Sequence, residues 1–204
     1  RAASGKYISI LLDVAYIEFA GDGSQKKFFQ KFSSLPENII TTVAYSMSKS
    51  YTAYGIRAGA CIIISSNEDI ANRAFDSMKH SNRSIWSNIT HAGMNILVDI
   101  ESDEKKKKSY EDELIANRRL IEKRASAFVE SAKEVGLIHL PYFGGFFISI
   151  PCENPKEVAE KLKEKDMYIV ANKNGLRFAV CAVSEEKCKI SPKLIKEAID
   201  KVNK

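Results

Sequence analysis

The chain has 204 residues, of which 45% are hydrophobic and 28% charged, and its formal net charge is +5. This length suits one ordinary domain or two small ones. The longest run of like charge, Lys105 to Lys108, follows the acidic stretch ESDE, a pattern typical of a solvated helix start rather than a nucleic-acid surface. No apolar run approaches the ~20 residues that a membrane-spanning helix needs, so we expect neither a membrane nor a nucleic-acid partner.

The cysteine pattern predicts a reducing compartment. The four cysteines form no CxxC pair and have no histidine at a metal-binding spacing, so we expect free thiols in a cytoplasmic protein and no metal site. The chain begins at Arg1 without a methionine and shows no signal or transit sequence. It enters an apolar run almost at once, and we expect it to be the middle of a longer protein.

Three short apolar runs predict the first strands, at Ile8 to Leu12, residues 39–45 and residues 60–64. Their β-branched composition and their length are typical of buried strands. The first run ends in Asp13, as a buried parallel strand does when a polar residue follows at its functional end. These runs, followed by helices, favour an α/β sheet.

Two helices are expected after these strands. Ser66 and Asp69 form an S-x-x-D capping box that predicts the start of the first helix. Its expected inward face carries Ile70, Ala74 and Phe75. A break near Ser87 and Asn88 separates it from a second, apolar helix around residues 94–100.

From about Ser109 the pattern predicts one long helix. Apolar residues recur at alternating spacings of four and three, which define one helix face. The members of this face are Ile121, Ala125, Phe128, Ala132 and Val135. Gly136 follows as the expected C-cap.

The remaining residues predict short strands and two more helices. The strand candidates are FFISI from Phe146, MYIV from Met167 and LRFAVCAV from Leu176. One helix is expected to open at Asn154 and Pro155, and the last is expected to begin with Ser191 as N-cap and Pro192 at its first position. Short strands with helices on one side favour a small α+β domain. We therefore divide the chain into residues 1–105 and 106–204.

Two stretches combine residues that suit chemistry. The first is DVAYIEFAGD, from Asp13 to Asp22, and the second is SMSKSYTAYGIRAG, from Ser46 to Gly59. An acid and a phenol follow one strand, and a lysine follows another. Open α/β sheets bind their ligands at such strand ends.

Both stretches resemble the class I aminotransferases, the pyridoxal-phosphate enzymes of the aspartate aminotransferase fold, and in particular the aspartate and aromatic amino-acid subgroup. Three later motifs follow in the same order: RSIWSN from Arg83, GGFF from Gly144 and GLRF from Gly175. The resemblance covers the whole chain. It implies fold type I, in which residues 1–105 belong to a large three-layer domain with a mixed, mainly parallel sheet. It also implies a homodimer with shared active sites.

The resemblance implies a cofactor role for five residues, and each role has a chemical reason. Lys49 forms a Schiff base with the aldehyde of pyridoxal 5'-phosphate, which requires a partly desolvated amine. The carboxylate of Asp13 keeps the pyridine nitrogen protonated, and Tyr16 donates to the cofactor's phenolate oxygen. Arg57 offers a planar fork of donors to the phosphate, and Ser46 adds a hydroxyl.

The resemblance also implies substrate contacts. Arg177 matches the arginine that grips the substrate α-carboxylate, and Arg83 the one that meets a distal carboxylate in the partner subunit's site. Phe147 lines the pocket. Trp86 stands where a tyrosine is usual and Ile89 where a proline is usual, so the choice of substrate stays open between aspartate and aromatic amino acids.

Other interpretations remain for these residues. Taken alone, Asp13 suits a turn cap, Lys49 a solvated loop, and Arg57 or Arg83 a surface charge of small energetic value. A β-eliminating lyase of the same fold would use the same lysine and aspartate. A non-catalytic regulator could retain the fold as a sensing module.

Family members are much longer than this chain. Their N-terminal half supplies the first phosphate-binding turn, the ring that stacks on the pyridine and an asparagine motif, and none of these is present here. We therefore expect a fragment that holds the second half of the large domain and the small domain. By itself it is expected to fold at least in its C-terminal part and to show no transaminase activity.

Overall fold

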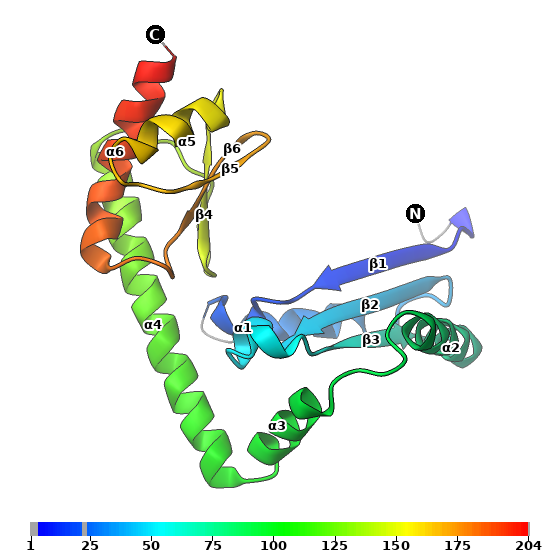
Figure 1. The fold of residues 1–204 in the computed structure, drawn as a ribbon. Coiled ribbons are helices and arrows are strands. Elements are labelled where there is room, and N and C mark those ends of the chain that lie inside the picture. The colour runs from blue at the N-terminus through cyan, green and yellow to red at the C-terminus, as the bar shows by residue number, and fades with distance from the viewer. Residues whose placement is uncertain (1–3, 22–23, 204) are drawn as a thin grey trace. The chain divides into compact units, whose positions relative to one another are not determined.

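The structure is a computed structural model that describes residues 4–21 and 24–203; Asp22, the last residue of the first motif, lies outside this range. The chain forms two compact units, Arg1–Asp112 and Glu113–Lys204 (Figure 1). We call them unit 1 and unit 2. The division into residues 1–105 and 106–204 stays a prediction about the domains of the whole protein. Within the described residues no helix is long and apolar enough to cross a membrane.

Unit 1 is built on a three-stranded sheet in the order β1-β2-β3. Strand β1 (Ile8–Asp13) pairs in parallel with β2 (Ile39–Ser46), and β2 pairs antiparallel with β3 (Gly59–Ser65). The predicted α/β class with a mixed sheet is therefore confirmed. The parallel pairing sets Asp13 opposite Ala44, so the two predicted site motifs follow strands that end at the same edge.

The core of unit 1 is small. Val14, Ile17 and Val43 are buried together, with Phe28 and Phe29 packed against them. The last two belong to the 3-10 helix at Ser24–Phe32, and Ile17 opens another at Ile17–Phe19.

The expectation that these strands are buried is wrong for β1 and β3, whereas β2 buries alternate residues. Strand β1 alternates between partly buried and exposed positions, and Leu11 is 69% exposed. Strand β3 has no buried residue. A strand is buried on both faces only where a layer packs on each side, and the described residues of unit 1 leave one face of β1 open.

Helix α2 (Glu68–Ile85) starts at a different cap from the one predicted. Its N-cap is Asn67, whose Oδ1 accepts the N–H of Ile70 at 3.0 Å, because the hydroxyl of Ser66 instead donates to the carbonyl of Leu35. The inward orientation of Phe75 is also wrong: the side chain is 60% exposed, and no residue of α2 is fully buried.

Helix α3 (His91–Glu101) confirms the second predicted helix. Its Gly93 makes a close approach that a larger residue would prevent. A Cβ at this position would overlap the Cβ of Ala58 and would lie 3.6 Å from the Sδ of Met47. Met47 begins the short helix α1 (Met47–Ser50), which contains Lys49. Helix α3 therefore packs against the segment that carries the predicted reactive lysine.

Helix α4 (Glu104–Glu134) begins in unit 1 and continues through unit 2. It starts at Glu104 rather than near Ser109, because Oδ1 of Asp103 accepts the N–H groups of Lys105 and Lys106 and caps the helix earlier. Four members of its predicted apolar face are buried: Ile121, Ala125, Phe128 and Ala132. Val135 lies just beyond the helix, and Gly136 follows with a φ of 66°.

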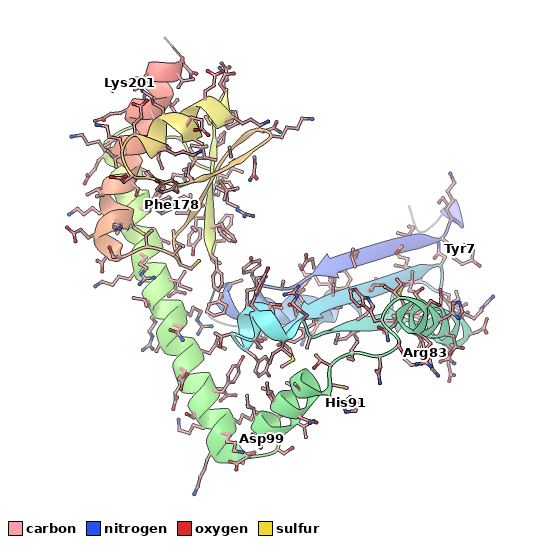
Figure 2. The ribbon with its side chains drawn as sticks, viewed as in Figure 1. Tyr7, Arg83, His91, Asp99, Phe178 and Lys201 are labelled. Atoms are coloured by element: carbon pink, nitrogen blue, oxygen red, sulfur yellow. The ribbon has the colours of Figure 1, made fainter. Side chains whose placement is uncertain are left out.

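Unit 2 packs α4, α5 (Pro155–Lys163) and α6 (Glu185–Val202) with an antiparallel sheet in the order β4-β6-β5. The strands are β4 (Phe147–Pro151), β5 (Val170–Asn172) and β6 (Gly175–Ala179). Phe178, labelled in Figure 2, is buried, and its ring centroid lies 4.5 Å from that of Phe128. This core belongs entirely to unit 2.

The predicted start of the last helix is wrong. Helix α6 is capped by Ser184, whose Oγ accepts the N–H of Lys187 at 3.3 Å, and Pro192 lies inside the helix. A proline at an interior position removes one backbone hydrogen bond. Burial on the same face compensates, since Cys188 and Ile195 are both fully buried, and the helix runs through.

Candidate active site

The segment that carries Lys49 is held at the end of β2. The Oγ of Ser46, the last residue of the strand, accepts the N–H of Ser48 at 3.2 Å and caps α1. The N–H of Met47 donates to the carbonyl of Ala58 at 3.1 Å. Ser48 and Ser50 are buried on either side of the partly buried Lys49. The backbone of Lys49 is thus fixed by its neighbours.

The ammonium group of Lys49 lies against two aromatic rings. Its Nζ is 5.2 Å from the ring centroid of Tyr16 and 5.3 Å from that of Tyr54. A cation at this distance is attracted by the ring quadrupole, and the rings exclude water from part of its surface. The structure therefore brings together a residue of the first motif and two of the second.

Arg57 joins the same cluster. Its Nη1 donates to the Oγ of Ser48 at 3.2 Å and to the carbonyl of Tyr54 at 2.9 Å, and its Cζ lies 4.7 Å from the Tyr54 ring centroid. The backbone of Arg57 is left-handed, with a φ of 58°. A non-glycine residue in this conformation carries strain that surrounding contacts must hold, a feature that concentrates at functional sites.

Asp13 lies at the same edge of the sheet, and its side chain is exposed. Its Oδ1 accepts the N–H of Ala15 at 3.1 Å, the contact of a turn cap, which is the ordinary alternative for this residue. The pairing of β1 with β2 places the backbone of Asp13 beside Ala44, in the strand that leads to Lys49.

Arg83 is not part of the cluster around Lys49. It lies on α2 (Figure 2), and its Nη1 donates to the Oγ of Ser87 at 2.6 Å and to the Ser87 carbonyl at 3.3 Å. The neighbouring Trp86 is 73% exposed. Trp86 and Arg57 contribute to the lining of one cavity of about 520 Å³, so the end of α2 lies near the arginine of the cluster.

Arg177 is the central candidate of unit 2. It lies on β6 between Ser149 and Val170 of the flanking strands, and its Cζ is 4.4 Å from the ring centroid of Phe147. Its Nε is buried and has no hydrogen-bond partner among the described residues. Arg177 also lines a largely apolar cavity of about 330 Å³. A buried donor without a partner is costly, so this guanidinium is suited to a carboxylate ligand.

One cluster next to Lys49 is absent from the sequence-based predictions. The ring of Tyr51 stacks on that of Tyr110, with centroids 4.6 Å apart and planes at 6°. The hydroxyl of Tyr51 donates to Glu101 at 3.2 Å, and that of Tyr110 to the carbonyl of Ser50 at 3.1 Å. Burial raises the pKa of both tyrosines above its usual range, so their hydroxyls stay donors at neutral pH.

Comparison with known proteins identifies the class. The family model described as aminotransferase class I and II matches residues 2–191, and the chain belongs to this family. The predicted family is therefore confirmed. A crystal structure of an aminotransferase from Anaerococcus prevotii DSM 20548 is 45% identical, with a TM-score of 0.91; the match covers 100% of this chain and 49% of that chain.

Curated relatives and a further solved structure agree with this result. An aspartate aminotransferase of Salmonella typhi is 32% identical over 127 residues, which cover 62% of this chain and 32% of the relative. The cytoplasmic aspartate aminotransferase of Gallus gallus is 26% identical over 93% of this chain and 46% of its own length. An aromatic-amino-acid aminotransferase from Burkholderia pseudomallei, covalently bound to pyridoxal phosphate, has the same fold, with 24% identity and a TM-score of 0.71, over 94% of this chain and 48% of that one. The chain thus spans half or less of the length of these proteins.

Proposed function

We propose that the whole protein is a pyridoxal-phosphate-dependent aminotransferase that exchanges the amino group of an aspartate-type or aromatic amino acid with a 2-oxo acid. The observation that carries this proposal is the cluster at the ends of β1 and β2. There the amine of Lys49 lies on the rings of Tyr16 and Tyr54 beside Arg57, in a chain of the aminotransferase family.

The residues of the cluster fit the chemistry of this cofactor. Arg57 presents a planar fork of donors beside the hydroxyls of Ser46 and Ser48, a donor set suited to a phosphate group. Asp13 supplies a carboxylate from the neighbouring strand, which would hold a protonated pyridine nitrogen. When bound, pyridoxal phosphate supplies an electron sink for the electrons of a bond broken at the substrate's Cα.

Lys49 has two tasks in this proposal. Its Nζ would hold the cofactor at the aldehyde carbon, with loss of water, until the substrate amine replaces it. The free amine of Lys49 would then take the proton from the substrate's Cα as a general base and return it as a general acid. The rings of Tyr16 and Tyr54 limit the positions of Nζ, and the phenol of Tyr16 would donate to the cofactor's phenolate oxygen.

Substrate recognition is assigned to three residues. Arg177 binds the α-carboxylate, which would satisfy its buried Nε, while Phe147 packs against the face of its guanidinium and fixes its plane. Arg83, held by Ser87, meets a distal carboxylate in the site of a second copy. A cytoplasmic homodimer with shared sites is part of this proposal.

Reduction of the intact protein with borohydride in the presence of the cofactor tests the assignment. We expect one cofactor adduct per chain, mapped by mass spectrometry to Lys49, and none in Lys49→Arg. Lys49→Ala is expected to lower turnover by at least about 10²–10⁴-fold, the contribution of a positioned acid–base group. An adduct at another lysine would contradict the proposal. Addition of a 2-oxo acid separates the alternatives, since a transaminase converts it to an amino acid whereas a β-lyase releases pyruvate and ammonia without it.

A further inference from the structure

The backbone around Lys49 is anchored differently on its two sides. On the N-terminal side, the N–H of Met47 donates to the carbonyl of Ala58, the residue directly before β3, and the Met47 side chain lies near Gly93 of α3. On the C-terminal side, the anchors are side chains. The carbonyl of Ser50, the residue directly after Lys49, accepts the hydroxyl of Tyr110 at 3.1 Å. Tyr110 lies sixty residues further along the chain.

The tyrosine pair is itself fixed from α3 and α4. The Tyr51 hydroxyl donates to Oε1 of Glu101, the last residue of α3. The other carboxylate oxygen of Glu101 lies 3.1 Å from the Nζ of Lys107. The hydrogen bond from Lys107, aided by that from Tyr51, lowers the pKa of Glu101, so the carboxylate remains an ionised acceptor. The ring of Tyr51 therefore has a hydrogen bond at its tip and a stacked partner on its face.

Movement of this pair would be transmitted to Lys49 through the backbone. The N–H of Thr52 donates to the carbonyl of Lys49 at 3.1 Å, and the N–H of Tyr51 donates to that of Met47 at 3.1 Å. Because α1 is only one turn long, it gains little stability from its own hydrogen bonds. The contacts from outside the helix decide where its residues lie.

We propose that Tyr110 is a positioning residue for Lys49: its hydroxyl and its stacked ring fix the Ser50–Tyr51 backbone and so hold the Lys49 amine between Tyr16 and Tyr54. This inference rests on the proposed function, which makes that amine the reacting group. Tyr110 contacts the backbone and Tyr51, and it acts through Lys49.

The test compares two tyrosine hydroxyls that make the same kind of bond. Tyr110→Phe keeps the stacked ring and removes the bond to Ser50. Tyr142→Phe is the matched control, because the Tyr142 hydroxyl, also partly buried, donates to the carbonyl of Gly145 at 2.6 Å in unit 2. Both variants are made in the intact protein, and the first two readouts are taken without cofactor.

The readouts are local. Amide hydrogen exchange is measured at Tyr51 and Thr52. The labelling rate of Lys49 by a small amine-reactive reagent is mapped by mass spectrometry and divided by that of Lys189, an exposed lysine of α6. The third readout is taken on the cofactor-loaded protein. It measures kcat and KM separately, so that any loss of kcat/KM can be assigned to one or the other.

In Tyr110→Phe we expect exchange at both amides and relative labelling of Lys49 to rise by about two- to tenfold, the effect of losing one hydrogen bond. We expect kcat to fall by a similar factor with the KM of the amino acid unchanged. Tyr142→Phe should match the wild type in all three readouts. If Tyr110→Phe does not accumulate as a folded protein, Tyr51→Phe, which removes the bond to Glu101 and keeps the stack, is expected to change the same readouts in the same direction.

Wild-type exchange and labelling in Tyr110→Phe would overturn the inference. An equal change in Tyr142→Phe would also overturn it, because the effect would then be a general loosening of the protein. The failure of the proposed function has a different signature: the wild-type protein would give no cofactor adduct at Lys49, while the exchange and labelling results would still decide whether Tyr110 positions that side chain.

Discussion

Unit 2 and unit 1 bury their apolar side chains to very different degrees. Unit 2 encloses large residues from its helices and from the turn after β6 with no exposure at all: Phe128, Val158, Leu162, Val180 and Ile195. In unit 1 the buried apolar cluster is small, α2 has no buried residue, and Leu11, Phe75 and Trp86 are more than half exposed. The candidate cofactor residues belong to the unit with the smaller core.

This difference shows two ways of holding a residue in place. In unit 2 close packing fixes the sheet on which Arg177 lies. In unit 1 the segment around Lys49 depends on a helix cap, on a glycine contact and on stacked tyrosines. Exposed apolar surface of the kind that unit 1 carries is typical of interfaces. We therefore expect mutations in the unit 2 core to act on stability, and mutations near Lys49 to act on chemistry.

The largest expected contrast comes from two phenylalanine truncations. Phe128→Ala removes a fully buried ring that contacts Phe178, and we expect it to lower the free energy of unfolding by about 3–5 kcal/mol. Phe75→Ala on α2 removes an exposed ring and should change the free energy of unfolding by no more than about 0.5 kcal/mol. Urea unfolding of the intact protein measures both. Equal losses would mean that Phe75 is covered in the whole protein and that the contrast between the units does not persist there.

A smaller effect is expected from the buried thiol of unit 2. Burial raises the pKa of Cys188 from 9.0 to about 11. The folded state then holds this proton more tightly than the unfolded state does, so the contribution of Cys188 to stability is complete below pH 9. It falls by about 2–3 kcal/mol as the pH rises to 11. Cys188→Ala should remove this part of the decline in unfolding free energy, measured by urea titration at each pH.

The control for this experiment is Cys61→Ala, which removes an exposed thiol from unit 1. Between pH 9 and 11 the free energy of unfolding of this variant is expected to decline as much as that of the wild-type protein. If the free energy of unfolding of Cys188→Ala declined as steeply with pH as that of the wild type, the shielding of this thiol from solvent in the structure would be contradicted.

The sequence predicted well what is encoded locally. Lys49, Arg57 and Ser46 belong to one short stretch whose residue types and spacing indicate the family, and the family is confirmed. The apolar face of α4 followed from its periodicity, because a helix with one apolar stripe must bury it. These features depend on residues that are close together in the chain.

Features that depend on distant residues could not be predicted in this way. The apolar pattern of β1 shows that Leu11 is suited to burial, but not whether another layer covers it. Pro192 suits a helix start, yet packing of the α6 face carries the helix through it. Tyr110 meets Ser50 from sixty residues away, and no local pattern indicates such a contact.

The smallest expected effect concerns the exposed aromatic ring of the Lys49 cluster. Tyr54 is 64% exposed, yet its ring faces both the Lys49 ammonium and the Arg57 guanidinium. A cation–π contact at an exposed site contributes about 0.5–1 kcal/mol, so losing it reduces binding by about two- to fivefold for each cation. We therefore expect Tyr54→Leu to weaken cofactor binding to the intact protein by about that factor, measured by fluorescence titration. Tyr54→Phe keeps the ring and should bind as the wild type does. If Tyr54→Phe is as weak as Tyr54→Leu, the hydroxyl and not the ring holds the cations, and the cluster depends on hydrogen bonds in place of the aromatic surface.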